Sequence, residues 1–536
     1  MALGVLVAPV EVQRERVQAH AARWIRERRF AFALVSALTG LAIAIEGYHP
    51  YAEDGGLYLA GVKRLLDGGL YPRDTAFVME PARRSLFAWM VAGLVRVSHV
   101  GLPAMLLALH VASIWATLAT AWMLAARCYR GRLARAGAVA LLACWMGLPV
   151  AGTALFLMDP YLTTRSFATP AMLLALAGAL DATERDGAER FRRRGVAMWA
   201  AGVAVCAAMH PLMGMYVVFA TMVLACLRAR SRASRTWGPV VLCAVAMSAA
   251  AFAQRTAKPE SGEYVRAALT RSYWFPGDWQ WYELVGLAAP LVILSALAWM
   301  RREDRPASMK QSDAVRTLAQ MAVIAGAAAW VVAAIFARES AAPFGLARLQ
   351  PLRMFQEVYF ILVMVLGAWM GERVLQRSAW RWVMALTLLG CMMFAAAREP
   401  YTHSRHIEAS WSAPRNEWAQ AFEWTRDNTP RDALFALDAD YIHTPGEDAQ
   451  SFRAIAERSS LPDYSKDGGE VSLAPQLAPV WVRAQAAEQG LSRASDAERI
   501  ERLQPLGVTW VVLEGGARTA FDCPYRNAAA KVCRLP

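Results

Sequence analysis

Charged residues are scarce in this sequence. Over 536 residues only 19% are Asp, Glu, Lys or Arg, whereas 56% are hydrophobic and the mean hydropathy is +0.26. A soluble protein of this length rarely carries so little charge. The composition therefore argues against a string of soluble domains and predicts a chain dominated by membrane-spanning helices.

Several enzyme motifs are missing as well. The sequence contains no GxxxxGK[ST] loop, no GxGxxG after a strand, no HExxH and no GxSxG. Nothing in it therefore indicates ATP hydrolysis, a bound dinucleotide or a serine hydrolase. There is no internal repeat, and no small-residue cleavage site follows the first apolar run, so a cleavable signal peptide is not expected.

Cysteine is also rare, with eight residues in all. Six lie in or beside apolar segments, where small core residues are expected. Cys523 and Cys533 lie together near the C-terminus and close a short loop, which predicts a disulfide if that part of the chain is oxidised. A zinc pair is disfavoured because no spaced His or Cys partners accompany them.

What the chain does have is a series of apolar windows of about 20 residues, the length that spans a bilayer. There are eleven of them: 30–46, 101–126, 136–157, 168–181, 196–210, 211–227, 237–253, 282–300, 315–337, 354–372 and 381–397. His210-Pro211 interrupts 196–227, which we interpret as two spans. The predicted fold is an all-α polytopic membrane domain of about 11 transmembrane helices, with a small C-terminal α/β extracytoplasmic domain.

The net charge is +13, and the basic residues behind it are unevenly distributed among the loops between the apolar windows. Arginine clusters fall in five alternate loops, as expected of the cytoplasmic side. These loops are Arg127–Arg135, Arg185–Arg194, Arg228–Arg235, Arg301–Lys310 and Arg373–Arg381. The pattern predicts a multi-pass protein of a bacterial inner membrane with a basic cytoplasmic N-terminus (1–29), and it argues against a nucleic-acid partner.

The remaining loops are then external, and they are the more elaborate ones: 47–100, 158–167, 254–281 and 338–353. After the membrane domain (30–399), residues 400–536 change character. Helical stretches at 414–428, 449–458 and 496–504 alternate with strand-like runs at 433–437 and 508–513. This pattern predicts a periplasmic α/β domain attached to the last span.

The first external loop holds the most informative residues. Glu53 and Asp54 follow the first span within the run that begins at His49, and Tyr58 to Leu70 has the spacing of an interfacial helix. A carboxylate at that depth can act as a general base between a lipid headgroup and an acceptor in water. Alternatively, Glu53 or Asp54 caps a helix that begins near Gly55.

Two further external groups are candidates. Asp159 lies where the third span leaves the membrane and either faces a cavity or forms an ion pair with Arg165. Arg348 and Arg353 precede the window at 354, contrary to the positive-inside pattern, and either bind a lipid-linked phosphate or contact ordinary headgroups. His210 is expected to be a capped imidazole at a kink, with ligand binding as the alternative.

These features together resemble the GT-C superfamily of polytopic membrane glycosyltransferases. The resemblance rests on Glu53-Asp54 after the first span, the large first external loop and the soluble domain after the last span. No WWDYG-like run is present, so the resemblance is to an uncharacterised bacterial subfamily. It implies transfer of a sugar from a polyprenyl-phosphate-linked donor to a periplasmic or lipid acceptor.

The resemblance also assigns roles to the candidate residues. Asp54, or Glu53 beside it, would deprotonate the acceptor, and Arg348 with Arg353 would stabilise the leaving phosphate. Asp159 would hold the acceptor or ligate a divalent cation, and metal dependence stays open. The remaining candidates for substrate binding are His49, Tyr58, Arg165 and His210.

Two other functions compete with transfer. A transporter or flippase of lipid-linked glycans would use the His210-Pro211 break, but the sequence has no inverted repeat and few intramembrane charges. A non-catalytic membrane assembly protein would leave Asp54 replaceable.

Overall fold

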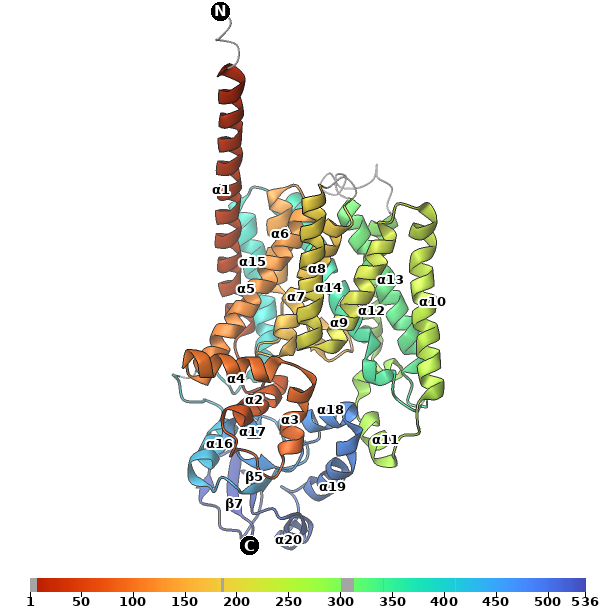
Figure 1. The fold of residues 1–536 in the computed structure, drawn as a ribbon. Helices are drawn as coiled ribbons and strands as arrows, with labels where there is room; N and C mark the ends of the chain where they lie inside the picture. The colour runs from red at the N-terminus through yellow and green to blue at the C-terminus, as the bar shows by residue number, and fades with distance from the viewer. Residues whose placement is uncertain (1–6, 185–187, 300–312, 341, 410) are drawn as a thin grey trace, which may run out of the picture.

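The structure is a computed structural model that describes residues 7–184, 188–299, 313–340, 342–409 and 411–536. A bundle of long helices forms one part of the molecule, and a smaller domain containing a β-sheet covers one end of it (Figure 1). Of the helices in the described residues, seven are long and apolar enough to cross a membrane. The chain is thus a multi-pass membrane protein, and the count of eleven spans stays a prediction.

Each apolar window of the sequence contains one helix of the bundle. The helices are α1 (Val7–Glu46), α5 (Leu102–Cys128), α6 (Arg132–Cys144), α7 (Thr164–Ala182), α8 (Glu189–Met209), α9 (Pro211–Leu227), α10 (Arg232–Thr256), α12 (Trp281–Trp299), α13 (Asp313–Phe336), α14 (Phe355–Trp369) and α15 (Ala379–Arg398).

One window is shorter than predicted. The window 136–157 was expected to be helical throughout, but α6 ends at Cys144, and a hairpin of β1 (Pro149–Val150) and β2 (Leu155–Phe156) follows it. The cause is local: Pro149 lacks the N–H that a continuing helix needs, and Gly152 has φ of +67°. The interruption at His210-Pro211 does separate two helices, α8 and α9, as expected.

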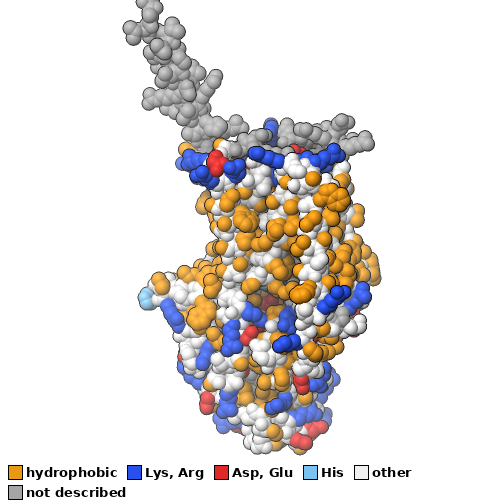
Figure 2. All heavy atoms as spheres, turned by 45° about the vertical axis from the view of Figure 1, so that its right-hand side comes forward, with side chains coloured by type: hydrophobic (Ala, Val, Ile, Leu, Met, Phe, Trp, Pro, Cys, Tyr) orange, Lys and Arg blue, Asp and Glu red, His pale blue; other side chains and the backbone are white. Residues whose placement is uncertain are grey.

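Basic side chains gather at the end of the bundle that lies away from the sheet domain. Lys and Arg side chains form a rim at the end opposite the sheet domain, above a broad hydrophobic band (Figure 2). The described parts of the predicted cytoplasmic loops connect helices at this end; residues 185–187 and the whole loop Arg301–Lys310 lie outside the described residues. The orientation in the membrane stays a prediction.

The loop 47–100, which is predicted to be external and keeps the name first external loop, forms three helices beside the sheet domain: α2 (Glu53–Leu66), α3 (Thr75–Arg84) and α4 (Phe87–Ser98). A helix is therefore present where 58–70 was predicted, but it begins five residues earlier and ends four residues earlier; its interfacial position stays a prediction. Gly68 and Gly69 follow its end, and glycine is a poor helix former. The loop 254–281 adds α11 (Gly262–Leu269), which lies against the sheet domain.

The C-terminal domain is α/β, as predicted. Its sheet has the order β4-β3-β5-β7-β6, parallel on one side and antiparallel on the other. The strands are β3 (Leu434–Ala436), β4 (Ser459–Ser460), β5 (Trp510–Glu514), β6 (Tyr525–Arg526) and β7 (Ala530–Arg534). The helices are α16 (Glu417–Asn428), α17 (Phe452–Ala456), α18 (Lys466–Leu473), α19 (Ala478–Glu488) and α20 (Asp496–Leu503).

Alternate strand residues bury opposite faces of this sheet. Phe435 and Trp510 belong to a core with Phe422 of α16, whereas Leu434 and Val511 belong to a second core on the other face. Period-two alternation with both faces covered is what a central strand requires. The runs at 433–437 and 508–513 showed this apolar character in the sequence.

Buried ion pairs join the first external loop to the C-terminal domain. Arg453 contacts Asp467 at 2.6 Å and also contacts Asp74 of the loop, and all three side chains are at most 8% exposed. Lys63 of α2 contacts Glu457 at 2.6 Å. A buried charge that loses its partner is costly, so these pairs fix how the two parts meet.

Cys523 and Cys533 form a disulfide in this domain. We expect the double replacement Cys523→Ser/Cys533→Ser to lower the free energy of unfolding by about 2–3 kcal/mol, because the bridge closes a short loop in the unfolded chain. Differential scanning calorimetry of the full-length protein measures this. Mass spectrometry of the unreduced protein that finds two free thiols would contradict the bridge itself.

Candidate functional site

The carboxylates of Glu53 and Asp54 lie in the first turn of α2. The residue before the helix is Ala52, whose methyl side chain cannot accept a hydrogen bond, so the alternative that Glu53 or Asp54 caps the helix is wrong. Glu53 has φ of +51°, a conformation that costs energy for a residue with a side chain.

Backbone from the C-terminal domain fixes this conformation. Glu53 N–H donates to the Ala449 carbonyl at 2.9 Å, and Ser451 N–H donates to the Tyr51 carbonyl at the same distance. Gly56 permits the close approach, because a Cβ there would lie 2.2 Å from Ser451 Cβ. The start of α2 is thus positioned by a segment almost 400 residues away in the chain.

Arg165 brings the two predicted carboxylate sites together. Its guanidinium contacts Asp159 at 2.8 Å and Asp54 at 3.3 Å. Asp159 is buried and also accepts from the Thr163 hydroxyl at 3.3 Å. The ion pair between Asp159 and Arg165 is therefore present, and through Asp54 it belongs to the candidate site.

Lys466 completes this charge cluster. It is the first residue of α18 in the C-terminal domain, and its ammonium contacts Glu53 and lies 3.5 Å from Asp54 Oδ1. The neighbouring Asp467 is held by Arg453 in the buried ion pairs described above. Sequence reasoning missed Lys466; the available signal was a lysine in a chain whose basic residues are mostly arginine.

The cationic surroundings act on the acidity of Asp54. Burial alone would raise the pKa of its carboxyl group, but the charges of Lys466, Arg165 and Arg353 lower this pKa to about 2. Asp54 is therefore a carboxylate at any physiological pH. Its side chain is about one third exposed, at 31%, so it can be reached from solvent.

The two predicted phosphate-binding arginines differ in how they are used. Arg348, in a short 3₁₀ turn (Ala347–Leu349), contacts Glu260 at 3.1 Å and the Tyr264 hydroxyl at 2.8 Å. Arg353, in the next turn (Pro351–Met354), lies over the Tyr273 ring. Its buried Nε has no hydrogen-bond partner among the residues that the structure describes. Arg353 thus has donor capacity left for an anion.

A cavity of about 400 Å³, here called the first cavity, opens beside this cluster. Its walls combine apolar residues at the ends of α8 and α9 with polar side chains from three external loops and α18. The polar and charged lining residues are Tyr58, Arg84, Ser85, Thr164, His210, Arg348 and Glu470. Three predicted substrate-binding residues, Tyr58, His210 and Arg348, therefore share one cavity.

The first cavity and Asp54 lie on the same side of α2. Tyr58 follows Asp54 by four residues, which places the two on one helix face. The Thr164 hydroxyl lies 3.4 Å from the Tyr58 hydroxyl, and Thr164 precedes Arg165. His210 does cap α9, since its ring accepts a hydrogen bond from Met213 N–H at 3.4 Å.

His49 lies apart from this group. It is fully buried, its Nδ1 is 3.0 Å from Glu408 Oε2, and its ring stacks on Tyr401. It does not line the first cavity. The contacts of His49 with Glu408 and Tyr401 fix the position of the loop before α2.

The acidic residues of the site are not arranged as metal ligands. Asp54 and Asp159 both contact Arg165, and Glu53 contacts Lys466. Within the described ranges, no group of three or more His, Cys, Asp or Glu side chains converges. A divalent cation needs several oxygen ligands, and these carboxylates already face cations, so they do not fit such an ion.

No family model and no curated protein sequence matches the chain. Among solved structures, the chain is similar to the Archaeoglobus fulgidus oligosaccharyltransferase in the apo form. The TM-score is 0.46 at 10% identity, over 90% of this chain and 69% of that one. It is also similar to ArnT from Cupriavidus metallidurans in the apo state, with a TM-score of 0.37 at 13% identity, over 96% of this chain and 98% of that one. Both likenesses are weak, and we take neither as support for an activity.

Proposed function

We propose that this chain is a membrane glycosyltransferase that moves a sugar from a polyprenyl-phosphate-linked donor to a periplasmic or lipid acceptor. One observation carries the proposal: a solvent-accessible carboxylate, Asp54, lies within electrostatic range of Arg353, whose buried Nε has no partner among the described residues. Proton acceptor and phosphate-binding cation are what a glycosyl transfer with a phosphate leaving group needs.

The reaction then proceeds by direct displacement. A hydroxyl or amine of the acceptor attacks the anomeric carbon while its proton passes to Asp54. The bond from that carbon to the phosphate oxygen breaks, and polyprenyl phosphate leaves with the electron pair. Arg353 stabilises the charge that develops on the phosphate, and Arg165 holds Asp54 in place.

The first cavity suits the donor. It has apolar walls from Met209, Pro211 and Leu212 at the ends of two bundle helices and polar groups from the external loops. A lipid-linked phosphate is divided in the same way, with an apolar chain to lie against the apolar walls and a charged head to lie among the polar groups. Arg348 lines this cavity, but its charge is already paired with Glu260, so it forms part of the wall more than it supplies a free positive charge.

We expect Arg353→Met to raise the KM for donor at least about tenfold, because one charge-assisted hydrogen bond contributes about 1.5–3 kcal/mol. Purified full-length protein would be added to membranes of a strain lacking the gene, which hold donor and acceptor. Released polyprenyl phosphate would be measured by mass spectrometry.

Arg338→Met is the matched control, because Arg338 is exposed at the same end of the bundle and bonds only its own helix backbone in the described contacts. Equal KM values for Arg353→Met and wild type would refute the phosphate assignment. If the wild-type protein releases no polyprenyl phosphate from these membranes, the transferase proposal fails, and transport or assembly becomes the better explanation.

A further inference from the structure

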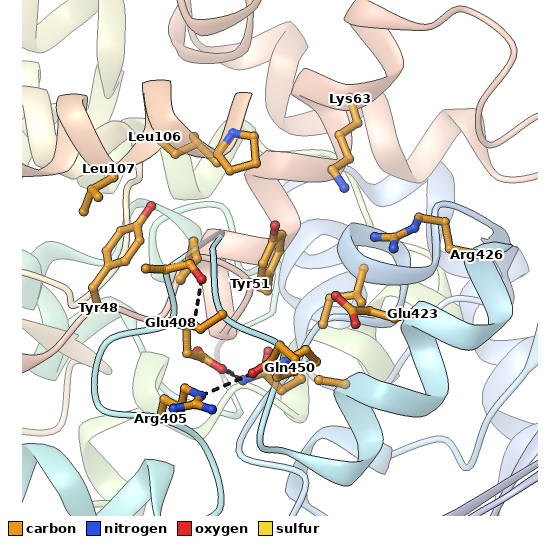
Figure 3. A pocket seen from close by; sticks show the side chains of 18 residues that line it. Tyr48, Tyr51, Lys63, Leu106, Leu107, Arg405, Glu408, Glu423, Arg426 and Gln450 are labelled. Atoms are coloured by element: carbon orange, nitrogen blue, oxygen red, sulfur yellow. Dashed lines mark hydrogen bonds between the residues drawn. The ribbon is translucent and has the colours of Figure 1, made fainter. Parts of the chain in front are cut away.

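A second cavity, of about 280 Å³, lies between the first external loop, the start of α5 and the C-terminal domain (Figure 3). Tyr48, Tyr51 and Lys63 come from the loop region, and Glu423 and Arg426 come from α16. In Figure 3 the side chains of Lys63, Glu423 and Arg426 point into the space beside Tyr51.

This cavity is separated from the reacting groups by α2. Lys63 follows Asp54 by nine residues, which is about half a turn out of phase at 3.6 residues per turn. The two side chains therefore leave opposite faces of the helix. A molecule held in the second cavity beside Lys63 is not positioned for attack at Asp54, so this cavity and the first serve different groups.

Two buried polar atoms at the second cavity lack partners. The Tyr48 hydroxyl and Gln450 Oε1 make no hydrogen bond within the described part of the chain, although Tyr48 is 2% exposed and Gln450 is 0% exposed. An unsatisfied buried polar group costs about 1–3 kcal/mol. Gln450 Oε1 needs a hydrogen-bond donor, whereas the Tyr48 hydroxyl can donate or accept. The hydroxyl groups of a ligand can satisfy both atoms.

The positively charged residues of the lining are Lys63, Arg405 and Arg426, and each has a polar partner, which separates this cavity from an anion site. Arg405 Nε donates to the Ala413 carbonyl at 3.2 Å. Lys63 donates to the Ala454 carbonyl and contacts Glu457, and Arg426 contacts Asp427. Glu423 adds a carboxylate whose pKa is raised, chiefly by burial. The lining therefore offers hydrogen-bond acceptors and a tyrosine ring more than free positive charge.

We propose that the second cavity binds an uncharged, hydroxyl-rich sugar ring. Hydroxyl groups would bond Tyr48, Gln450 and Glu423, and the apolar face of the ring would lie on Tyr51. The volume is just below the lower end of usual ligand pockets, which suits a single ring. The ring belongs to an acceptor glycan or to a glycolipid headgroup; its role in transfer rests on the proposed function.

Binding is tested on the full-length protein in lipid nanodiscs by saturation-transfer difference NMR. The probes are the methyl glycosides of glucose, galactose, mannose and N-acetylglucosamine, which carry no leaving phosphate and cannot be transferred. We expect at least one glycoside to give a signal that falls at least about fivefold in Tyr48→Phe/Glu423→Gln. Both changes keep side-chain size: the first removes the tyrosine hydroxyl, and the second replaces the carboxylate with a neutral amide.

The matched control is Tyr282→Phe/Glu501→Gln, in which both residues are exposed and distant in sequence from the cavity. Three results would overturn the proposal: no glycoside signal with wild type, equal signals in wild type and the cavity variant, or displacement of the glycoside by inorganic phosphate. Adding a glycolipid to the nanodisc separates the two sources, because a headgroup already in the cavity suppresses the signal of the soluble glycoside.

This outcome is distinct from that of the proposed function. A glycoside signal that needs Tyr48 and Glu423, found together with wild-type transfer by Asp54→Asn, would keep the sugar cavity and refute the transferase mechanism. Loss of transfer in Asp54→Asn, found together with no glycoside signal in the wild-type protein, would keep the transferase mechanism and refute the sugar cavity.

Discussion

Asp54→Asn is expected to lower the rate of sugar transfer by about 10²–10⁴-fold, the range for loss of a general base. Asparagine has the size of aspartate but cannot take the proton of the acceptor. The fold should persist, since Arg165 keeps its contact of 2.8 Å with Asp159. The measurement is polyprenyl phosphate release by purified protein, together with the surface glycans of a complemented deletion strain.

The low pKa of Asp54 shapes this expectation. With a pKa of about 2 the carboxylate is a weak proton acceptor in the free protein. A donor phosphate beside Arg353 offsets one of the positive charges that lower this pKa, so the carboxylate becomes more basic when the donor is bound. Asp54 thus first orients the acceptor by hydrogen bonding, and takes its proton as the new bond forms.

Asp67→Asn is the control, since Asp67 lies at the other end of α2 and pairs with Arg431 on the surface. Glu53→Gln separates the two adjacent carboxylates: Glu53 contacts Lys466 alone among the described ion pairs, and we expect a smaller effect there. If Asp54→Asn transfers at the wild-type rate while the deletion strain has a glycan defect, Asp54 is structural and a transporter or scaffold role is favoured.

The helical framework followed from the sequence because a bilayer imposes its length on every apolar window. Each predicted window contains a helix, and the window at 136–157 was overestimated only because Pro149 and Gly152 were read as part of an apolar run. The C-terminal strands were recognisable where both faces are buried, as in β5. The edge strands β4 and β6 have two residues each and left no period to detect.

The candidate site was predictable only in part. Glu53, Asp54, Asp159 and Arg353 were found because charge at the membrane boundary is costly and therefore conspicuous. The ion pair of Asp159 with Arg165 was one of the predicted alternatives, but the contacts of Asp54 were not predicted. Arg165 and Lys466 reach Asp54 from positions 111 and 412 residues further along the chain. Local patterns carry no information on pairs so distant in sequence, and the cap interpretation failed because it considered the helix alone.

Lys466→Met is expected to slow transfer about 10- to 100-fold and to change its pH dependence. Lys466 is a positioning residue: it contacts both carboxylates from the C-terminal domain and lowers the pKa of Asp54. Without this cation the pKa of Asp54 rises from about 2 by about one unit. A carboxylate with a depressed pKa is active above that pKa and inactive below it, so the acid limb of kcat/KM moves to higher pH.

The profile of kcat/KM between about pH 1.5 and 5 measures this shift, because it covers the acid limbs of both proteins and reports groups of the free enzyme. Lys466→Arg should restore the wild-type limb, since it returns the charge. Lys531→Met serves as the control: this lysine lies in the same domain and donates to the Ala517 carbonyl. A slower variant with an unmoved acid limb would mean that Lys466 only holds α18 against α2. A moved limb would mean that the C-terminal domain sets the charge state of the carboxylate, which makes that domain part of the reacting site.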